Sequence, residues 1–144
     1  MKISTKGRYA LRLMMELALS DQDRPVRIRE IAEKQTISDK YLEQIISVLN
    51  KAGFVRSIRG PQGGYLLTRK PIEYTAGDIL RLTEGSLAPV DCVDGSLYDC
   101  PRVEKCATSI LWKRMNDAIN DVVDSITLED LANWQIAKNG DYCI

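Results

Sequence analysis

The first third of the chain combines apolar and polar residues in a pattern that predicts three helices. Over 5–20, apolar residues recur at three- and four-residue intervals, which is typical of a helix with one buried face. A short second helix is predicted over 27–34, and a third over 39–52 with Ser38 as its N-cap and Gly53 as its C-terminal cap. The second and third helices, joined by about four residues, form a helix-turn-helix.

The helix predicted over 39–52 has two faces of different character. One face is apolar and suits a core: Leu42, Ile45, Ile46 and Leu49. The other face carries side chains that can reach the bases and phosphates of DNA: Lys40, Glu43, Gln44, Ser47 and Lys51. An ordinary amphipathic helix with a solvated face would show the same division, so the next segment decides between the two interpretations.

Two β-prone segments, 54–59 and 65–68, flank the glycine-rich sequence 60–64, and together they predict a β-hairpin. A hairpin that follows a helix-turn-helix is a wing. Arg56 and Arg59 lie on it, and Arg59 adjoins a slim tip that suits a narrow minor groove. A phosphate-binding loop is the alternative, but no helix follows the glycines directly and a Gly-Lys-Ser/Thr sequence is missing.

The second half of the chain predicts further helices. One begins after Thr75 as its N-cap and ends before Gly85. The next covers 108–125, followed at 126 by one more apolar residue, and its apolar stripe suits packing against another helix: Leu111, Met115, Ile119, Val122 and Ile126. Thr127 then caps a short last helix that ends near Ile136.

Residues 85–106 lose this periodicity and carry Cys92, Cys100 and Cys106, which are separated by seven and five residues. Loops of this length tend to be functional or disordered. Three thiolates on a flexible loop can converge on an iron–sulfur cluster or a soft metal. The tight cysteine pairs of zinc sites are missing, and a chain without histidine has neither a Cys/His zinc site nor a Rieske centre. On spacing alone, a cluster, zinc or a thiol switch, and incidental cysteines all stay open.

Composition limits the size and the location of the protein. With 144 residues, 44% of them hydrophobic, the chain can bury one core or one small domain plus an extension, but not two large domains. No run approaches the roughly 18 apolar residues of a membrane span, and Arg12 and Glu16 interrupt the apolar N-terminal segment. We therefore expect no signal peptide and no membrane partner. We expect a cytoplasmic location, whose reducing environment argues against a disulfide framework.

A net charge of zero conceals an asymmetry between the two halves. Residues 1–80 carry 14 Lys and Arg against 9 Asp and Glu, a net charge of +5, whereas residues 81–144 carry 6 against 11, a net charge of −5. This distribution favours a polyanion as the partner of the first half only, although two ordinary solvated surfaces would also account for it.

Three segments resemble the Rrf2 family of bacterial winged-helix regulators: Met-Lys-Ile-Ser-Thr-Lys-Gly-Arg-Tyr-Ala-Leu at 1–11, Ile-Ser-Asp-Lys-Tyr-Leu-Glu-Gln at 37–44, and Ser-Ile-Arg-Gly-Pro-Gln-Gly-Gly-Tyr-Leu-Leu at 57–67. The cysteine trio and the segments Leu-Trp at 111–112 and Ile-Thr-Leu-Glu-Asp-Leu at 126–131 are similar to the IscR-like iron–sulfur cluster regulators of that family. These matches span nearly the whole chain, and their combination is specific.

The resemblance implies a mainly α-helical homodimer, without enzyme activity or a small-molecule substrate, that controls iron–sulfur cluster assembly genes, for example as a repressor. Its parts would be a winged helix-turn-helix domain over 1–84, a cluster-binding loop over 85–107, and a dimerisation helix with a short C-terminal helix over 108–144. A 2Fe-2S cluster would lie on Cys92, Cys100 and Cys106. Contacts to double-stranded operator DNA are expected from Ser38, Lys40, Tyr41, Glu43 and Gln44, and from Arg56, Arg59 and Pro61 on the wing.

Three positions depart from the family pattern. A histidine is expected three residues after the last cysteine, where this chain has Ser109, so the fourth cluster ligand stays open among Cys143, Glu104 and Asp99. The first two cysteines are also further apart than the pattern has them. Thr36 occupies a turn position where a glycine is usual, which costs stability if the turn requires a positive φ.

Other functions remain alternatives at this point. A nitric oxide sensor of the same family would carry an aspartate in the first helix where this chain has Arg8. A cysteine-metabolism regulator of the family would lack the cysteine trio. A metal-carrying redox subunit that uses the winged helix to bind protein belongs to a different class, and without histidine it has no Cys-His or Ser-His pair to act with.

Overall fold

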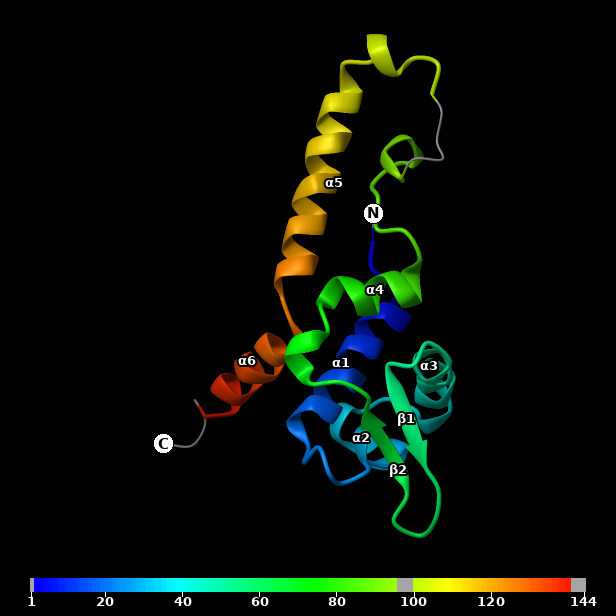
Figure 1. The fold of residues 1–144 in the computed structure, drawn as a ribbon, viewed down its shortest axis with the longest axis vertical. Coiled ribbons are helices and arrows are strands. Elements are labelled where there is room, and N and C mark those ends of the chain that lie inside the picture. Colours follow the sequence, from blue (N-terminus) through cyan, green and yellow to red (C-terminus); the bar gives the residue numbers. More distant parts are fainter. Residues whose placement is uncertain (1, 96–99, 141–144) are drawn as a thin grey trace.

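The computed structural model describes residues 2–95 and 100–140, and Figure 1 shows their arrangement. The helices are α1 (Thr5–Leu19), α2 (Ile28–Gln35), α3 (Asp39–Lys51), α4 (Ala76–Glu84), α5 (Thr108–Ser125) and α6 (Leu128–Gly140). The strands β1 (Val55–Ile58) and β2 (Gly64–Leu67) form an antiparallel hairpin between α3 and α4. The predicted mainly helical fold with a hairpin wing is confirmed. Within the described residues, no helix has the length and apolar character needed to cross a bilayer.

Side-chain caps begin the helices at the residues that the sequence indicates. The Ser38 hydroxyl accepts a hydrogen bond from the Tyr41 amide. Thr75 and Thr127 each form a reciprocal cap with the third residue of the helix that follows, Asp78 and Asp130 respectively. These three predicted starts are confirmed, because a cap needs only residues within one turn of each other.

The last helix and the segment before α4 differ most from the prediction. The last helix runs to Gly140 instead of ending near Ile136, since the residues in between contain no helix breaker and Gln135 donates a hydrogen bond to Asn139 across one turn. A short 3-10 turn, η1 (Pro71–Glu73), which the apolar pattern did not predict, precedes α4. It brings Tyr74 into the core.

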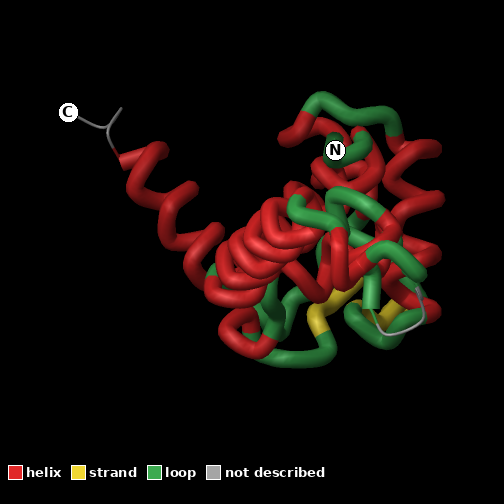
Figure 2. The backbone as a smooth tube through the Cα atoms, turned by 90° about the horizontal axis from the view of Figure 1, so that it is seen from above, coloured by secondary structure: helices red, strands yellow, loops and turns green. Residues whose placement is uncertain are grey.

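The core joins the N-terminal helices to the last one. Leu13 of α1, Ile45 of α3, Ile79 of α4 and Leu128 of α6 are all fully buried in one cluster. The start of α6 therefore belongs to the hydrophobic core of the winged-helix part. Figure 2 shows that its C-terminal part is directed away from the other helices.

The segment that leads into α4 pairs through its backbone with the segment that leads into α6. Ala76 donates to the Ile126 carbonyl at 2.8 Å, Leu128 donates to the Tyr74 carbonyl at 2.9 Å, and Thr75 and Thr127 form an isolated antiparallel bridge. The Tyr74 hydroxyl, buried in the core, donates to the Phe54 carbonyl at 2.7 Å. The pairing thus connects the base of the wing to the end of α5.

Arg81 on α4 forms hydrogen bonds with two residues of α5. Its guanidinium donates to both carboxylate oxygens of Asp124, at 2.6 and 3.0 Å, and to Asn120 at 2.9 Å. The hydrogen bond between them raises the pKa of Arg81 and lowers the pKa of Asp124, because it favours the charged form of each group. Gly77 permits this approach, because a Cβ there would lie 2.2 Å from an Asp124 carboxylate oxygen.

Thr36, in the turn between α2 and α3, has the left-handed conformation with φ 55° and ψ 49°. It is the one non-glycine residue with positive φ in the part of the chain that the structure describes. Arg12 stabilises the end of α2 next to it, donating to the Gln35 side chain and to the Gln35 carbonyl, both at 2.6 Å. The turn therefore has the positive φ at which a non-glycine residue costs stability.

We expect Thr36→Gly to stabilise the protein by about 0.5–1 kcal/mol, because glycine removes the steric cost of a left-handed backbone. The greater entropy of the unfolded chain with glycine offsets part of this stabilisation. Urea unfolding measures the change. Ala52→Gly is the matched control: Ala52 ends α3 in a right-handed conformation, so the same increase in backbone freedom should only destabilise. Equal destabilisation by both substitutions would contradict the strain at Thr36.

Candidate nucleic-acid interface and cysteine loop

The two predicted faces of α3 are confirmed by burial. The apolar residues Leu42, Ile45, Ile46 and Leu49 are buried against the core, whereas the polar residues Ser38, Lys40, Glu43, Gln44 and Ser47 are exposed. The N-cap at Ser38 fixes where the helix starts, so these exposed groups lie along its first turns. Their contact with DNA stays a prediction.

Tyr41 differs from the other predicted contact residues, because it is only partly exposed. Its ring lies edge-on to that of Tyr9 at a centroid distance of 5.7 Å, and the Arg12 guanidinium lies 5.2 Å from the Tyr9 ring. Aromatic pairs of this geometry stabilise packing. Tyr41 therefore joins α3 to α1, a role that the helical pattern alone did not indicate.

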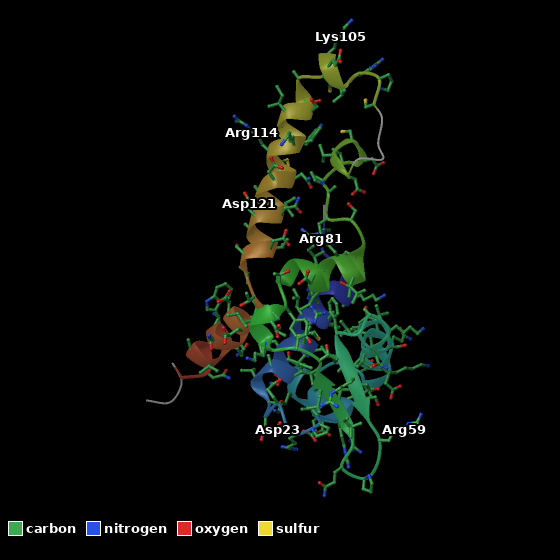
Figure 3. All side chains as sticks on the ribbon, viewed as in Figure 1. Asp23, Arg59, Arg81, Lys105, Arg114 and Asp121 are labelled. Atoms are coloured by element: carbon green, nitrogen blue, oxygen red, sulfur yellow. The ribbon has the colours of Figure 1, made fainter. Side chains whose placement is uncertain are left out.

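The wing is anchored to Val26, two residues before the start of α2. In the hairpin Val55 pairs with Leu67 and Ile58 with Gly64, and Tyr65 also forms two backbone hydrogen bonds with Val26, at 2.8 and 3.0 Å. The predicted contact residues of the wing are all exposed: Arg56, Arg59 and Pro61. Figure 3 shows the Arg59 side chain directed outward from the hairpin.

An open groove of about 580 Å³ separates α3 from the wing. Glu43, Ser47 and Asn50 line it from α3, and the wing contributes Ser57 and Gly60. Arg27, which precedes α2, lines it as well. Arg27, Asn50 and Ser57 were not among the predicted site residues, because their shared groove depends on how the wing folds back over the helices. A side-chain pattern within one helix carries no such signal.

The cysteine loop contains two short 3-10 turns, η2 (Asp91–Val93) and η3 (Val103–Lys105). Cys92, Cys100 and Cys106 are free and partly exposed. Within 2–95 and 100–140, no three metal-ligating side chains lie close enough to hold a metal ion, so the loop does not bring the three thiols together. Of the other candidate ligands, Glu104 is exposed, whereas Asp99 and Cys143 lie outside the described residues.

The surroundings of two of the cysteines suit ligand chemistry. The Cys106 sulfur lies 3.2 Å from the Thr108 hydroxyl. Hydrogen bonds from Thr108 and from the Ser109 backbone lower the pKa of Cys106 and so favour the thiolate, the form that binds metals. Cys92 lines an open cavity of about 370 Å³ together with Val103 and Ser109. The donor set therefore fits a thiolate-bound cluster, while ligation by all three cysteines requires the loop to close.

Sequence comparison relates more than nine tenths of the chain to known regulators. Residues 3–134 match a family described as "Rrf2: Iron-dependent Transcriptional regulator". The chain is 46% identical over 134 residues to the HTH-type transcriptional regulator CymR of Bacillus subtilis, covering 93% of this chain and 91% of that protein. It is 39% identical over 133 residues to the HTH-type transcriptional regulator IscR of Pectobacterium atrosepticum, covering 92% and 80% respectively.

Solved structures show the same architecture. The structure of CymR, the global cysteine regulator of B. subtilis, superposes with a TM-score of 0.78 at 46% identity and covers 93% of this chain and 98% of that one. The structure of T. potens IscR superposes with a TM-score of 0.74 at 42% identity and covers 92% and 87%. Both superpositions cover more than nine tenths of this chain.

Arg59→Ala should weaken DNA binding and reduce its salt dependence by about one unit of slope, because one cationic contact to the backbone or minor groove is lost. Titrations of operator DNA at several salt concentrations measure both quantities. Lys138→Ala on α6 is the control, since it removes the same charge far from the wing in the sequence and from an exposed position. Unchanged affinity and slope for Arg59→Ala would remove the wing from the interface.

Proposed function

Because the chain belongs to the Rrf2 family of transcriptional regulators, we propose that it is a cytoplasmic homodimer that binds operator DNA and responds to a 2Fe-2S cluster. It is a DNA-binding transcriptional regulator and not an enzyme, which removes the redox-subunit alternative. The observation that carries the cluster proposal is the trio Cys92, Cys100 and Cys106 on the loop between α4 and α5. Iron–sulfur cluster assembly genes, controlled for example by repression, are the proposed targets.

The dimer proposal is supported by the exposure of α5. Every residue of this helix is described, and all are at least partly exposed. Four large apolar side chains lie open to solvent: Ile110, Leu111, Met115 and Val122, with exposed fractions of 63, 51, 37 and 55%. Apolar surface on this scale indicates a protein partner. A second copy is proposed because one winged helix of about 80 residues contacts only a short half-site of the operator. Two winged-helix domains, here called the two reading heads, are therefore needed for specificity.

Replacing both Met115 and Ile119 with Asp should convert the dimer to monomers and leave the winged helix folded, since two carboxylates cannot be buried in an apolar interface. Sedimentation gives the mass, and circular dichroism checks the fold. Lys113→Asp adds a carboxylate to the same helix outside the stripe and should remain dimeric. An intact dimer in the double variant would refute an interface on this face of α5.

The loop is placed where its arrangement can affect DNA recognition. It connects the end of α4, which is part of the core, to the start of α5, the proposed dimer helix. Cys92, Cys100 and Cys106 would hold the cluster, with the fourth ligand open. When bound, an iron–sulfur cluster supplies a redox-active group whose presence depends on iron and sulfur supply. A closed loop would then hold α4 and α5 in one relative orientation, and with them the two reading heads.

Glu43 is the proposed element of operator selection. It is exposed on α3 and lines the groove toward the wing. A carboxylate repels phosphate and only accepts hydrogen bonds, so it disfavours operators that offer no cytosine amino group. A change in how the reading heads are held would alter this penalty. Loss of the cluster would therefore relax the selectivity among operators without abolishing DNA binding.

Alanine at Cys92, Cys100 or Cys106 should remove the visible absorption of the anaerobically purified protein, because each substitution deletes one thiolate ligand. The same variants should lose some operators and keep others in gel shifts. Val90→Ala, on the same loop but without a thiol, should stay coloured and retain the wild-type operator set. Three coloured variants, or three variants that bind every operator like the wild type, would refute the switch.

A second candidate is a cysteine-responsive regulator. The 46% identity to CymR over nearly the whole chain favours it, and the solved relative is described as a global cysteine regulator. The cysteine trio argues for the cluster instead. A colourless wild-type protein, purified without oxygen and still binding its operator, would support this second candidate. A nitric oxide sensor would share the coloured cluster, so only the response of operator binding to nitric oxide would distinguish it.

A further inference from the structure

Arg27 connects the helix-turn-helix to the tip of the wing. It is the N-cap residue of α2, in extended conformation, and its side chain is exposed. One guanidinium nitrogen donates a hydrogen bond to the Pro61 carbonyl, 34 residues further along the chain. Arg27 lines the groove between α3 and the wing, and also a second hollow of about 450 Å³ behind the tip that includes Asp23 and Gln62. Its side chain therefore lies between the two hollows under the wing tip.

The base and the tip of the wing are held in different ways. The base is fixed through the backbone, because Tyr65 pairs with Val26 and a Cβ on Gly64 would lie 2.6 Å from the Val26 carbonyl oxygen. The tip closes on itself, with Gly63 donating to the Gly60 carbonyl at 2.9 Å. In the part of the chain that the structure describes, the bond from Arg27 to Pro61 is the hydrogen bond that ties residues 60–63 to a helix.

We infer that Arg27 is a positioning residue for the wing: by holding the Pro61 carbonyl it sets the angle of the tip, and so decides whether the adjacent Arg59 reaches the DNA. This inference rests on the proposed contact of the wing with DNA. The proline ring fixes the φ of Pro61, so the carbonyl that Arg27 binds belongs to a stiff part of the tip. Without that bond, the tip can turn about the base of the hairpin and the Arg59 guanidinium moves with it.

Arg27 can also act on the DNA itself. A guanidinium has five N–H donors in a planar fork, so the group that holds Pro61 keeps donors for a phosphate in the groove. Glu43 lines the same groove with the opposite charge. Arg27 would therefore offset the repulsion between this carboxylate and a passing DNA strand. Among the residues that line the second hollow, Arg24 forms an ion pair with Glu30 at 3.4 Å, and Arg27 is the other cation.

A double-mutant cycle between Arg27→Met and Arg59→Ala tests the positioning role on the full-length protein and its operator. Arg27→Met keeps an unbranched apolar stem but removes the charge and the donors of the guanidinium. We expect it to weaken binding about fivefold, the equivalent of one exposed hydrogen bond. Arg59→Ala should weaken binding about tenfold in the wild type but less than about threefold in the Arg27→Met background, because a displaced tip no longer presents Arg59.

Two further variants separate position from charge. Arg29→Met removes the same charge two residues away, where Arg29 is exposed and paired with Glu33 along α2, and it should leave the effect of Arg59→Ala unchanged. Arg27→Lys retains a donor for the Pro61 carbonyl and should restore most of that effect. Thermal unfolding and dimer mass, expected to match the wild type, show that all variants are folded.

The outcomes distinguish this inference from the proposal beneath it. If the losses from Arg27→Met and Arg59→Ala simply multiply, or if Arg29→Met behaves like Arg27→Met, the positioning role of Arg27 is wrong while the wing contact stands. If Arg59→Ala alone leaves operator binding unchanged, the wing contact itself is wrong.

Discussion

The backbone pairing of residues 74–76 with residues 126–128 is the constraint on which the rest of the structure depends. Ala76 and Leu128 donate across it at 2.8 and 2.9 Å, and Leu128 is fully buried directly after it. The chain between these two segments must therefore return to the place where it started. The chain does so through α4, the cysteine loop and α5, so that Figure 1 shows α5 rising from the body with η3 at its far end.

This path explains why α5 is held at its C-terminal end and yet open to solvent. Its C-terminal end is held by the buried Leu128, and its last turns are held by the ion pair between Arg81 and Asp124. The remaining apolar side chains, such as Leu111 and Val122, have no core to reach. In the dimer proposed above, this surface would join two winged-helix domains at a fixed spacing on the DNA.

The candidate DNA interface depends on the same core from the opposite side. Tyr74 is buried beside the pairing and holds the Phe54 carbonyl, so the base of the wing is tied to the segment that anchors α5. Val26 and Arg27 fix the wing further out, at Tyr65 and Pro61. Tyr74 therefore connects the segment that anchors α5 to the base of the wing.

The sequence by itself determined the features that depend on near neighbours. The caps at Ser38, Thr75 and Thr127 and the two faces of α3 follow from residues within one or two helical turns, where spacing alone decides the contact. Only the tertiary structure decided three other features: the burial of Leu128, the clamp between Arg81 and Asp124, and the bond from Arg27 to Pro61. Their partners lie tens of residues apart, and no periodic pattern records which segments meet when the chain folds back on its own core.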